Sequence, residues 1–472
     1  MDVNISQLIA ALPDDGGPSS TQTLTQERVH EIFADLAYRP MPLGSLHRLW
    51  TASELSAQIA LAYLAYGIRQ WFCDAETAEK ALLETNLRVA LKVFHRLGYL
   101  RGAFAKIGQT AAHMPNVLPD QVAETLDTLH SSAPPMHYLL IREVVRNEFG
   151  KDPEELFATF EREAFAAASI GQVHRATLKT GERVAVKIQY PGIARTIDAD
   201  FRNIQALMLP MRLGKEWESV KAQAGEIHRM LKQEVDYRQE AESLRNAAAL
   251  FQPEDGIVVP RVYPEVSGLR VLTTELLQGT HLPEYLAANP TQASRNEFGT
   301  KIDRAWWRLY LAFIGYSDPN PGNYIFLSDG RLGLLDFGCV RHFTEEEREL
   351  VRLADKAAFE DPSLMPQLVQ KACGIHPADP EFGAYLRIMQ DTCDWMLAPH
   401  SQPGPFDFGN PSHFDKGAEL FSGVVRSRHV RAHPMYVYHN RAVYGLLALL
   451  YRLGAQVDVA EVLRQERARN PA

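Results

Sequence analysis

The sequence predicts an α+β protein in which a small lobe of mixed strands and helices is followed by a mainly helical lobe, behind an added N-terminal helical extension. Three observations predict this class. Between residues 52 and 112, apolar residues recur at intervals that form one helical face. Two stretches, 165–178 and 183–189, alternate apolar and polar residues as strands do, and Thr180-Gly181-Glu182 between them predicts the turn of a hairpin. From Leu282 onward, helical patterns predominate.

Composition and charge limit the class of protein and its partners. The 472 residues are 46% hydrophobic, which is enough for a large buried core, and the length predicts two or three domain-sized units. Lys and Arg total 49 against 58 Asp and Glu, so no basic excess favours nucleic acid as a partner. The four cysteines, Cys73, Cys339, Cys373 and Cys393, form no Cys-x-x-Cys pair, which predicts a reducing, cytoplasmic compartment.

We expect neither a targeting segment nor a transmembrane helix. The first residues, Met1–Asn4, lack the basic and apolar regions of a signal peptide. The most apolar windows, 59–68 and 442–451, are shorter than the about 20 residues that span a bilayer. The apolar run at 61–66 predicts a helix packed in the core, and peripheral contact with a membrane is the alternative interpretation.

Proline, glycine and charge patterns divide the chain into three parts. Stretches rich in Pro, Gly and Ser at 13–20 and 40–44 predict a partly ordered lead-in, which together with the helical extension covers residues 1–94. Residues 95–275 are assigned to the small lobe. Residues 276–472 are assigned to the helical lobe, which continues to the C-terminal helices.

The order of elements within the two lobes follows from the same patterns. One long helix is expected between Ala222 and Phe251, where apolar residues recur among charges. Strands are expected at 258–263 and 270–275. In the helical lobe, two short strand-like stretches at 324–326 and 332–335 interrupt the helices.

The strongest chemical signal is a loop followed by a short hairpin-like stretch. Asp318 and Asn323 lie five residues apart, and Asp336 follows in Asp336-Phe337-Gly338, which is the spacing of a kinase catalytic core. Asp and Asn oxygens suit Mg²⁺, and Asp318 can orient an attacking hydroxyl or water. The alternative is that Asp318 and Asn323 are only turn residues in a Pro/Gly-rich loop. We therefore predict an Mg-ATP site in a protein-kinase-like bilobal fold.

The small lobe supplies candidate residues for binding the phosphates of the nucleotide. Lys187 lies among apolar neighbours on a predicted strand and resembles the kinase lysine that contacts nucleotide phosphates. The preceding arm, Ala166-Ala167-Ala168-Ser169, stands where kinases carry a glycine loop, so a stiffer loop is expected over the phosphates. Glu240 is the chosen acidic partner of Lys187, with Glu234 and Asp236 as alternatives. A solvated charged helix face is the competing interpretation.

One further segment makes the resemblance to a known family specific. Lys106-Ile107-Gly108-Gln109 is similar to the Lys-x-Gly-Gln signature of the UbiB (ADCK, AarF) family of atypical kinases. The other marks of that family are an alanine-rich loop, a Val-Ala-Val-Lys strand and a Glu-x-Asp helix, and all follow here in order. The resemblance covers about residues 95–345.

The resemblance implies a gate over the cleft. In this family the Lys-x-Gly-Gln helices pack where a peptide substrate would lie, so Lys106, Gly108 and Gln109 are assigned to the gate. Lys106 is expected to reach Glu234 and Asp236 and is counted with the catalytic residues. Protein phosphorylation would then be obstructed.

The resemblance also implies cofactors and individual roles. Lys187 would contact the ATP phosphates, Asp318 would be the catalytic carboxylate, and Asn323 and Asp336 would hold Mg²⁺. Glu275 falls at the hinge position that would face adenine. Family members support isoprenoid-quinone (ubiquinone) biosynthesis or lipid homeostasis, which implies a small or lipid-like substrate and quinone-biosynthesis enzymes as partners.

Two departures from the family pattern leave two functions open. Tyr316 and Asn320 stand where the motif His-x-Asp-Pro-His-Pro-Gly-Asn has histidines, which removes a group that braces the catalytic loop. The first hypothesis is an ATPase or small-molecule kinase, and the second is a pseudokinase that acts as a nucleotide-sensing scaffold. A third hypothesis, a metal site among the C-terminal histidines, has metal-ligand spacing only at His429 and His433.

Overall fold

The computed structural model describes residues 136–168, 170–194, 197, 201, 217–316, 320–427 and 432–469. These residues divide into two compact units. The first unit holds described residues within 136–176 and 187–201, and the second holds those within 177–186 and 217–469. The expected N-terminal helical extension lies outside the described residues, and the division into parts at residues 94 and 275 stays a prediction.

The first unit combines one long helix with a strip of short strands. Its elements are α7 (Tyr138–Phe149), α8 (Pro153–Leu156), β1 (Thr159–Phe160), β2 (Ala166–Ala168) and β3 (Gly171–Thr177). The chain from β1 to β2 runs antiparallel along β3. The Glu161 amide donates to the Arg175 carbonyl (2.9 Å), and further along Ala166 lies opposite Val173.

The hairpin expected from the alternating stretches is confirmed. A tight turn precedes β4 (Arg183–Gln189), where the Leu178 amide donates to the Glu182 carbonyl (2.9 Å). Gly181 in this turn has φ +101°, a conformation that residues with a Cβ rarely adopt. In the second unit, Val271–Glu275 forms strand β6.

The single long helix expected over 222–251 is wrong, because the structure has two helices there, α10 (Trp217–Glu234) and α11 (Tyr237–Ala248). The first helix ends at Glu234, and Asp236 begins the second. Its side chain accepts a hydrogen bond from the Arg238 amide as the N-cap of α11. Aspartate is among the preferred N-cap residues, so the break has a local cause that apolar periodicity does not reveal.

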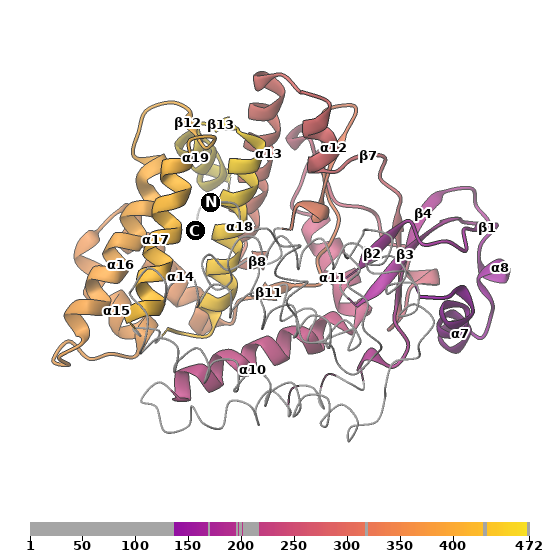
Figure 1. Ribbon diagram of the computed structural model, residues 1–472, viewed down its shortest axis with the longest axis horizontal. Coiled ribbons are helices and arrows are strands. Elements are labelled where there is room, and N and C mark those ends of the chain that lie inside the picture. The colour runs from indigo at the N-terminus through magenta and orange to yellow at the C-terminus, as the bar shows by residue number, and fades with distance from the viewer. Residues whose placement is uncertain are drawn as a thin grey trace, which may run out of the picture. The chain divides into compact units, whose positions relative to one another are not determined.

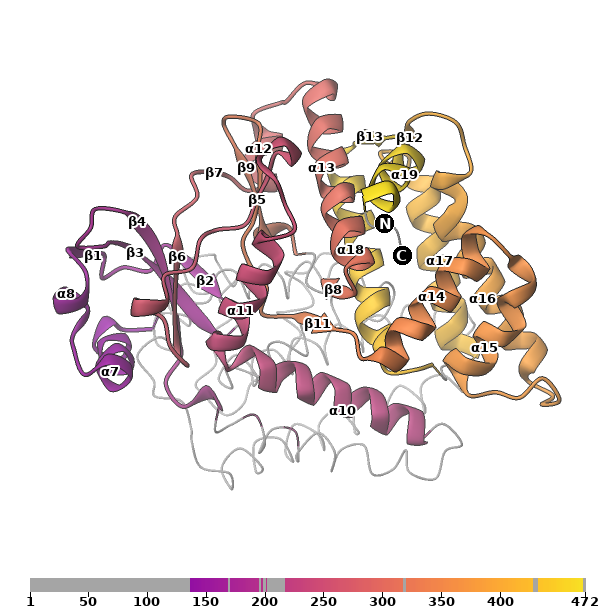
Figure 2. The same cartoon turned by 180° about the vertical axis from the view of Figure 1, so that it is seen from behind.

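The rest of the second unit is mainly helical (Figures 1 and 2). Its remaining helices are α12 (Leu282–Ala287), α13 (Gln292–Leu311), α14 (Glu345–Phe359), α15 (Met365–Cys373), α16 (Phe382–Leu397), α17 (Pro411–Ser427), α18 (Met435–Leu453) and α19 (Val459–Arg469). Its remaining strands are β5 (Ile257–Val258), β7 (Gly279–Thr280), β8 (Ile314–Tyr316), β9 (Tyr324–Leu327), β10 (Leu332–Leu334), β11 (Val340–His342), β12 (Phe406–Asp407) and β13 (Gln456–Val457). None of the described helices combines the length and the apolar content that crossing a bilayer requires.

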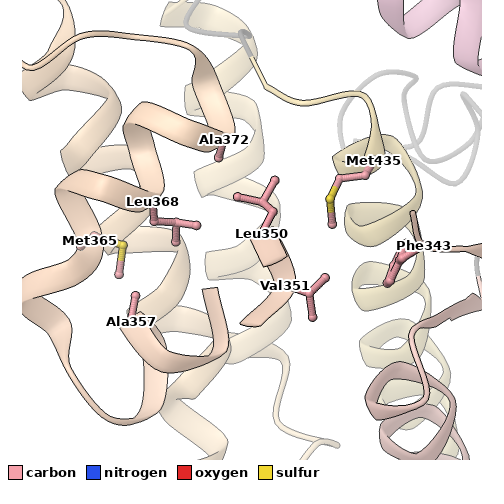
Figure 3. Packing of buried hydrophobic residues seen from close by; sticks show 8 residues of the cluster. All are labelled: Phe343, Leu350, Val351, Ala357, Met365, Leu368, Ala372 and Met435. Atoms are coloured by element: carbon pink, nitrogen blue, oxygen red, sulfur yellow. The ribbon is translucent and has the colours of Figure 1, made fainter. Parts of the chain in front are cut away.

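One core cluster of this unit joins α14, α15 and the start of α18. Figure 3 shows its side chains gathered between these helices. The members are Phe343, Leu350, Val351, Ala357, Met365, Leu368, Ala372 and Met435. Burial of these apolar side chains is the main favourable term that holds the three helices together.

Buried ion pairs fix α13 against α19. Arg308 is 2% exposed, and its guanidinium donates two hydrogen bonds of 2.7 Å to the Glu466 carboxylate. It also pairs with Asp255, which precedes β5. A buried guanidinium needs such partners, because its desolvation is otherwise costly.

The contact between α16 and α17 gives a prediction on stability. A Cβ added at Gly417 in α17 would lie 2.1 Å from Cζ2 of Trp395, a fully buried ring in α16. We expect Gly417→Ala to lower the free energy of unfolding by about 1–3 kcal/mol through overpacking. The matched control is Gly225→Ala in α10, where the Cβ meets nothing within 4 Å. That variant should gain up to about 1 kcal/mol from helix propensity. Urea unfolding of both measures the difference, and equal stabilities would contradict the packing of α16 on α17.

Candidate functional site

A short hairpin brings Asn323 and Asp336 to the same end of two paired strands. Asn323 comes directly before β9, and Asp336 follows β10 by two residues. The strands pair antiparallel, with Tyr324 opposite Leu334. The pairing extends one step further, because the Leu335 amide donates to the Asn323 carbonyl (2.9 Å). The hairpin-like stretch predicted between the two candidate metal ligands is therefore confirmed.

Local hydrogen bonds shape the chain at both candidate ligands. The Asn320 side chain accepts a hydrogen bond from the Gly322 amide (2.8 Å), and the Asn323 amide donates to the Asn320 carbonyl (2.8 Å). Asn320 thus forms the turn that leads into Asn323. After β10, the Asp336 carboxylate accepts from the Gly338 amide (2.8 Å). Asp318 itself lies outside the described residues.

A buried tyrosine stands where the family motif has its first histidine. Tyr316 in β8 is 5% exposed, and its ring centroid lies 5.1 Å from that of Phe337. β8 pairs with β11, so Tyr316 also lies opposite Val340. Aromatic packing therefore connects strand β8 to the Asp336–Gly338 segment, with a tyrosine in place of a histidine.

Glu240 in α11 lies against the same segment. This glutamate is 4% exposed. A Cβ placed on Gly338 would lie 3.3 Å from the Glu240 carboxylate and 3.2 Å from the Asp336 carboxylate, so a side chain at this position would crowd both. Lys187, the expected partner of Glu240, lies on β4 in the first unit, and their pairing stays a prediction.

The two carboxylates of the Glu-x-Asp motif have different partners among the described residues. Glu234 is 5% exposed and accepts a hydrogen bond from the Cys339 thiol (2.6 Å). Asp236 accepts two hydrogen bonds of 2.9 Å from the Arg238 guanidinium, which lower the pKa of Asp236. Lys106, with the other gate residues, lies outside the described residues, and its pairing with this motif stays a prediction.

A second buried ion cluster fastens α10 to the chain that follows Gly338. Arg341 in β11 pairs with Glu226 of α10 and with Glu347 of α14, and all three residues are at most 8% exposed. Because Glu234 contacts Cys339, α10 is held to this segment at two points, eight residues apart on the helix. Sequence reasoning missed Glu226, Arg341 and Glu347, since charged residues usually face solvent.

A polar cavity opens between α10, α11 and the segment after Asp336. Its volume is about 410 Å³. The lining residues are Arg229, Gln233, Gln239, Glu240, Glu242, Ser243, Asn246, Phe337, Gly338, Val340 and His342. Glu240 and Gly338 thus form part of its wall, so the cavity adjoins the candidate site.

The alanine run and Glu275, which are expected on the phosphate and adenine sides, lie on two short strands. Ala166, Ala167 and Ala168 form β2, paired with the start of β3 in the first unit, and Ser169 lies outside the described residues. Glu275, at the end of β6 in the second unit, has an exposed side chain. Its amide donates to the Arg261 carbonyl (2.8 Å), which fixes the backbone at the expected hinge.

The C-terminal histidines that the structure describes are mainly packed on aromatic rings. The His400 ring lies 5.5 Å from Trp307, and the His439 ring lies 5.6 Å from Tyr310. Burial lowers the pKa of both histidines to about 4. Among the described residues, no three His, Cys, Asp or Glu side chains are grouped so that they could hold a metal ion. His429 lies outside the described residues.

Comparison with known proteins decides the family. Residues 128–365, half of the chain, match the family described as the ABC1 atypical kinase-like domain. The chain belongs to this family. The match confirms the resemblance to UbiB (ADCK, AarF) atypical kinases, and with it the kinase-like fold expected from the motifs.

Several curated proteins are similar to this ABC1-family chain. It is 32% identical to "Atypical kinase COQ8B, mitochondrial" of Rattus norvegicus, over 90% of this chain and 81% of that protein. It is 30% identical to "Atypical kinase COQ8, mitochondrial" of Saccharomyces cerevisiae, over 68% of this chain and 64% of that protein. It is 32% identical to the uncharacterised protein slr0889 of Synechocystis sp., over 52% of this chain and 64% of that protein. The chain thus spans slightly less than two thirds of the length of the last two relatives.

Proposed function

We propose that this chain binds Mg-ATP and either hydrolyses it or transfers its γ-phosphoryl group to a small or lipid-like molecule. The observation that carries the proposal is the hairpin that sets Asn323 and Asp336 at one end of paired strands, with the buried Glu240 beside Gly338. Membership of an atypical kinase-like family supports it. A loop that served only to reverse the chain would need neither Asn323 and Asp336 at the same end of the strands nor a buried carboxylate beside Gly338.

The side chains present suit a magnesium nucleotide. An amide oxygen from Asn323 and a carboxylate from Asp336 are hard donors of the kind Mg²⁺ prefers, and the remaining positions around that ion are usually filled by water and phosphate. Bound Mg²⁺ would supply charge neutralisation at the phosphates. Lys187 would add a positive charge toward the phosphates, and Glu240 would orient that lysine.

Asp318 has the remaining chemical role in this proposal. It would accept a hydrogen bond from the attacking hydroxyl or water and hold the nucleophile in line with the phosphate. Tyr316 and Phe337 would position this loop through ring packing. Lys106, with Gly108 and Gln109, would cover the cleft and keep protein substrates out.

The resemblance to the family also suggests a biological role for this chain. We infer that the chain supports isoprenoid-quinone biosynthesis or lipid homeostasis, together with enzymes of quinone biosynthesis. Two relatives carry names that describe mitochondrial atypical kinases. The substrate would be small or lipid-like, and peripheral contact with a membrane would give access to it.

Nucleotide binding and phosphate release test the proposal together. Mg-ATP at 100 times its dissociation constant should stabilise the folded chain by about 2.7 kcal/mol, seen as a rise in melting temperature. Asp318→Asn should still be stabilised by Mg-ATP but should lose phosphate release by about 100-fold or more. Unchanged release in that variant would reject the role of Asp318. Stabilisation by Mg-ATP with no release above the variant would identify a nucleotide-sensing scaffold.

A further inference from the structure

The side chain of Gln172, at the start of β3, holds the residue that precedes helix α7. Its amide oxygen accepts a hydrogen bond from the Met136 amide (2.6 Å), and its amide nitrogen donates to the Met136 carbonyl (3.2 Å). Gln172 is 1% exposed. Because one partner is a donor and the other an acceptor, this pair of bonds permits only one orientation of the amide group.

The same amide nitrogen also contacts His174, two residues along the strand. Nε2 of His174 lies 3.0 Å from the Gln172 amide nitrogen, and Nδ1 lies 2.8 Å from the Glu161 carbonyl. The imidazole is fully buried and stacks on Phe160, with ring centroids 5.0 Å apart. The network therefore joins β1, β3 and the start of α7 within the first unit.

The partners of His174 fix its protonation state. The Glu161 carbonyl can only accept, so Nδ1 carries the ring proton. The Gln172 amide nitrogen can only donate, so Nε2 must be unprotonated. A proton on Nε2 would place two donors against each other, the Nε2 proton of His174 and the amide nitrogen of Gln172. The Gln172 amide cannot flip to relieve this, because it would lose both hydrogen bonds to Met136. Burial likewise lowers the pKa of His174.

We propose that Gln172 and His174 are positioning residues that hold the alanine-rich strand β2 in its register along β3. Gln172 lies opposite Ala167, and the Phe165 amide donates to the Val173 carbonyl (2.9 Å). The described part of the phosphate loop is thus paired with the stretch of β3 that the network anchors. The link to ATP rests on the proposed function, whereas the link to the order of β2 does not.

The network predicts how the strand responds to acid. The neutral ring contributes its full stabilisation above the unfolded pKa of about 6.5 and loses it progressively as the pH falls toward the lowered folded pKa. The charged groups that act on the ring are the Glu161 carboxylate, which favours the protonated form, and Arg175, which pairs with that carboxylate at 3.5 Å. Protonation should therefore loosen β2.

The test compares Gln172→Glu with Gln402→Glu in the full chain. The first replaces the donor to His174 by a carboxylate, and the second adds the same charge on an exposed loop, where Gln402 donates to the Pro405 carbonyl. NMR titration of His174 should show its pKa rising in Gln172→Glu and unchanged in Gln402→Glu. Amide exchange of 165–168 should become at least about fivefold faster in Gln172→Glu, as expected for a lost buried hydrogen bond. The Michaelis constant for ATP should rise by a similar factor, with a smaller change in kcat.

The outcomes separate the positioning role from the nucleotide site. Unchanged exchange of 165–168 in a folded Gln172→Glu variant would overturn the proposal, whatever happens to ATP. Faster exchange in a chain whose wild type binds no ATP would support the positioning role and reject the proposed function. If Gln172→Glu does not fold, amide exchange of the wild-type chain at two pH values tests the proposal instead. Its protection factors at 165–168 should fall between pH 7.5 and 5.5, and constant protection would overturn the proposal.

Discussion

Replacing Asp336 with asparagine is expected to reduce Mg-ATP-dependent phosphate release by about 100-fold or more, because a metal at the phosphates contributes several kcal/mol to the transition state. The amide keeps the size of the side chain and can still accept a hydrogen bond from the Gly338 amide. What it loses is the negative charge that we propose holds Mg²⁺. Measured against magnesium concentration, the variant should need more Mg²⁺ for half-maximal release.

The matched control is Asp329→Asn in the same hairpin. Asp329 lies in the turn between β9 and β10, at the end away from Asn323, where its carboxylate pairs with Arg331. Loss of this exposed pair should change phosphate release little. If Asp329→Asn impaired release as much as Asp336→Asn, the effect would come from the hairpin as a structural unit, and the metal role of Asp336 would be rejected.

The sequence predicted the hairpins because each was signalled locally. The turn at Gly181 and the alternation on either side predicted β3 and β4, which the structure confirms. The stretch between Asn323 and Asp336 was also foreseen, and pairing of its strands places the two candidate ligands together. Turn chemistry and period-two patterns act over a few residues, so they can be read without knowledge of the rest of the fold.

The break between α10 and α11 was missed for a physical reason. Apolar residues continue at helical spacing on both sides of Asp236, so periodicity alone predicted one helix. The break depends on the cap at Asp236 and on the Tyr237 amide, which donates to the carbonyl of Leu269, a residue 32 positions later. A contact at that separation is set by tertiary structure, and it could not be read from the segment itself.

The buried charges around Arg341 were missed for a related reason. Charged residues usually face solvent, and Glu226 lies 115 residues before its partner Arg341. The ion pairs form only in the folded chain, where β11, which follows the Asp336–Gly338 segment, lies against α10. The same holds for Gln172 and His174, whose buried network includes hydrogen bonds between residues up to 36 positions apart.

Removing the guanidinium of Arg341 is expected to have the largest effect on stability. Arg341→Met should lower the free energy of unfolding by about 3–5 kcal/mol, because the buried Glu347 loses its cation and the buried Glu226 keeps its pair with the partly exposed Arg229 but loses Arg341. The control is Arg331→Met, which breaks the exposed pair with Asp329 and should cost less than about 1 kcal/mol. Urea unfolding of the two variants measures the difference.

A rescue variant separates the charge from the packing in this cluster. Adding Glu226→Gln and Glu347→Gln to Arg341→Met removes the two buried carboxylates that lose their pair with Arg341 in the single variant. Glutamine at 347 can still accept the hydrogen bond that Glu347 receives from the Thr344 amide (3.0 Å), so the cap of α14 is kept. The triple variant should recover most of the lost stability if buried charge causes the loss. Failure to recover it would mean that the Arg341 side chain holds α10 through its packing, and the fastening of α10 would then not depend on the ion pairs.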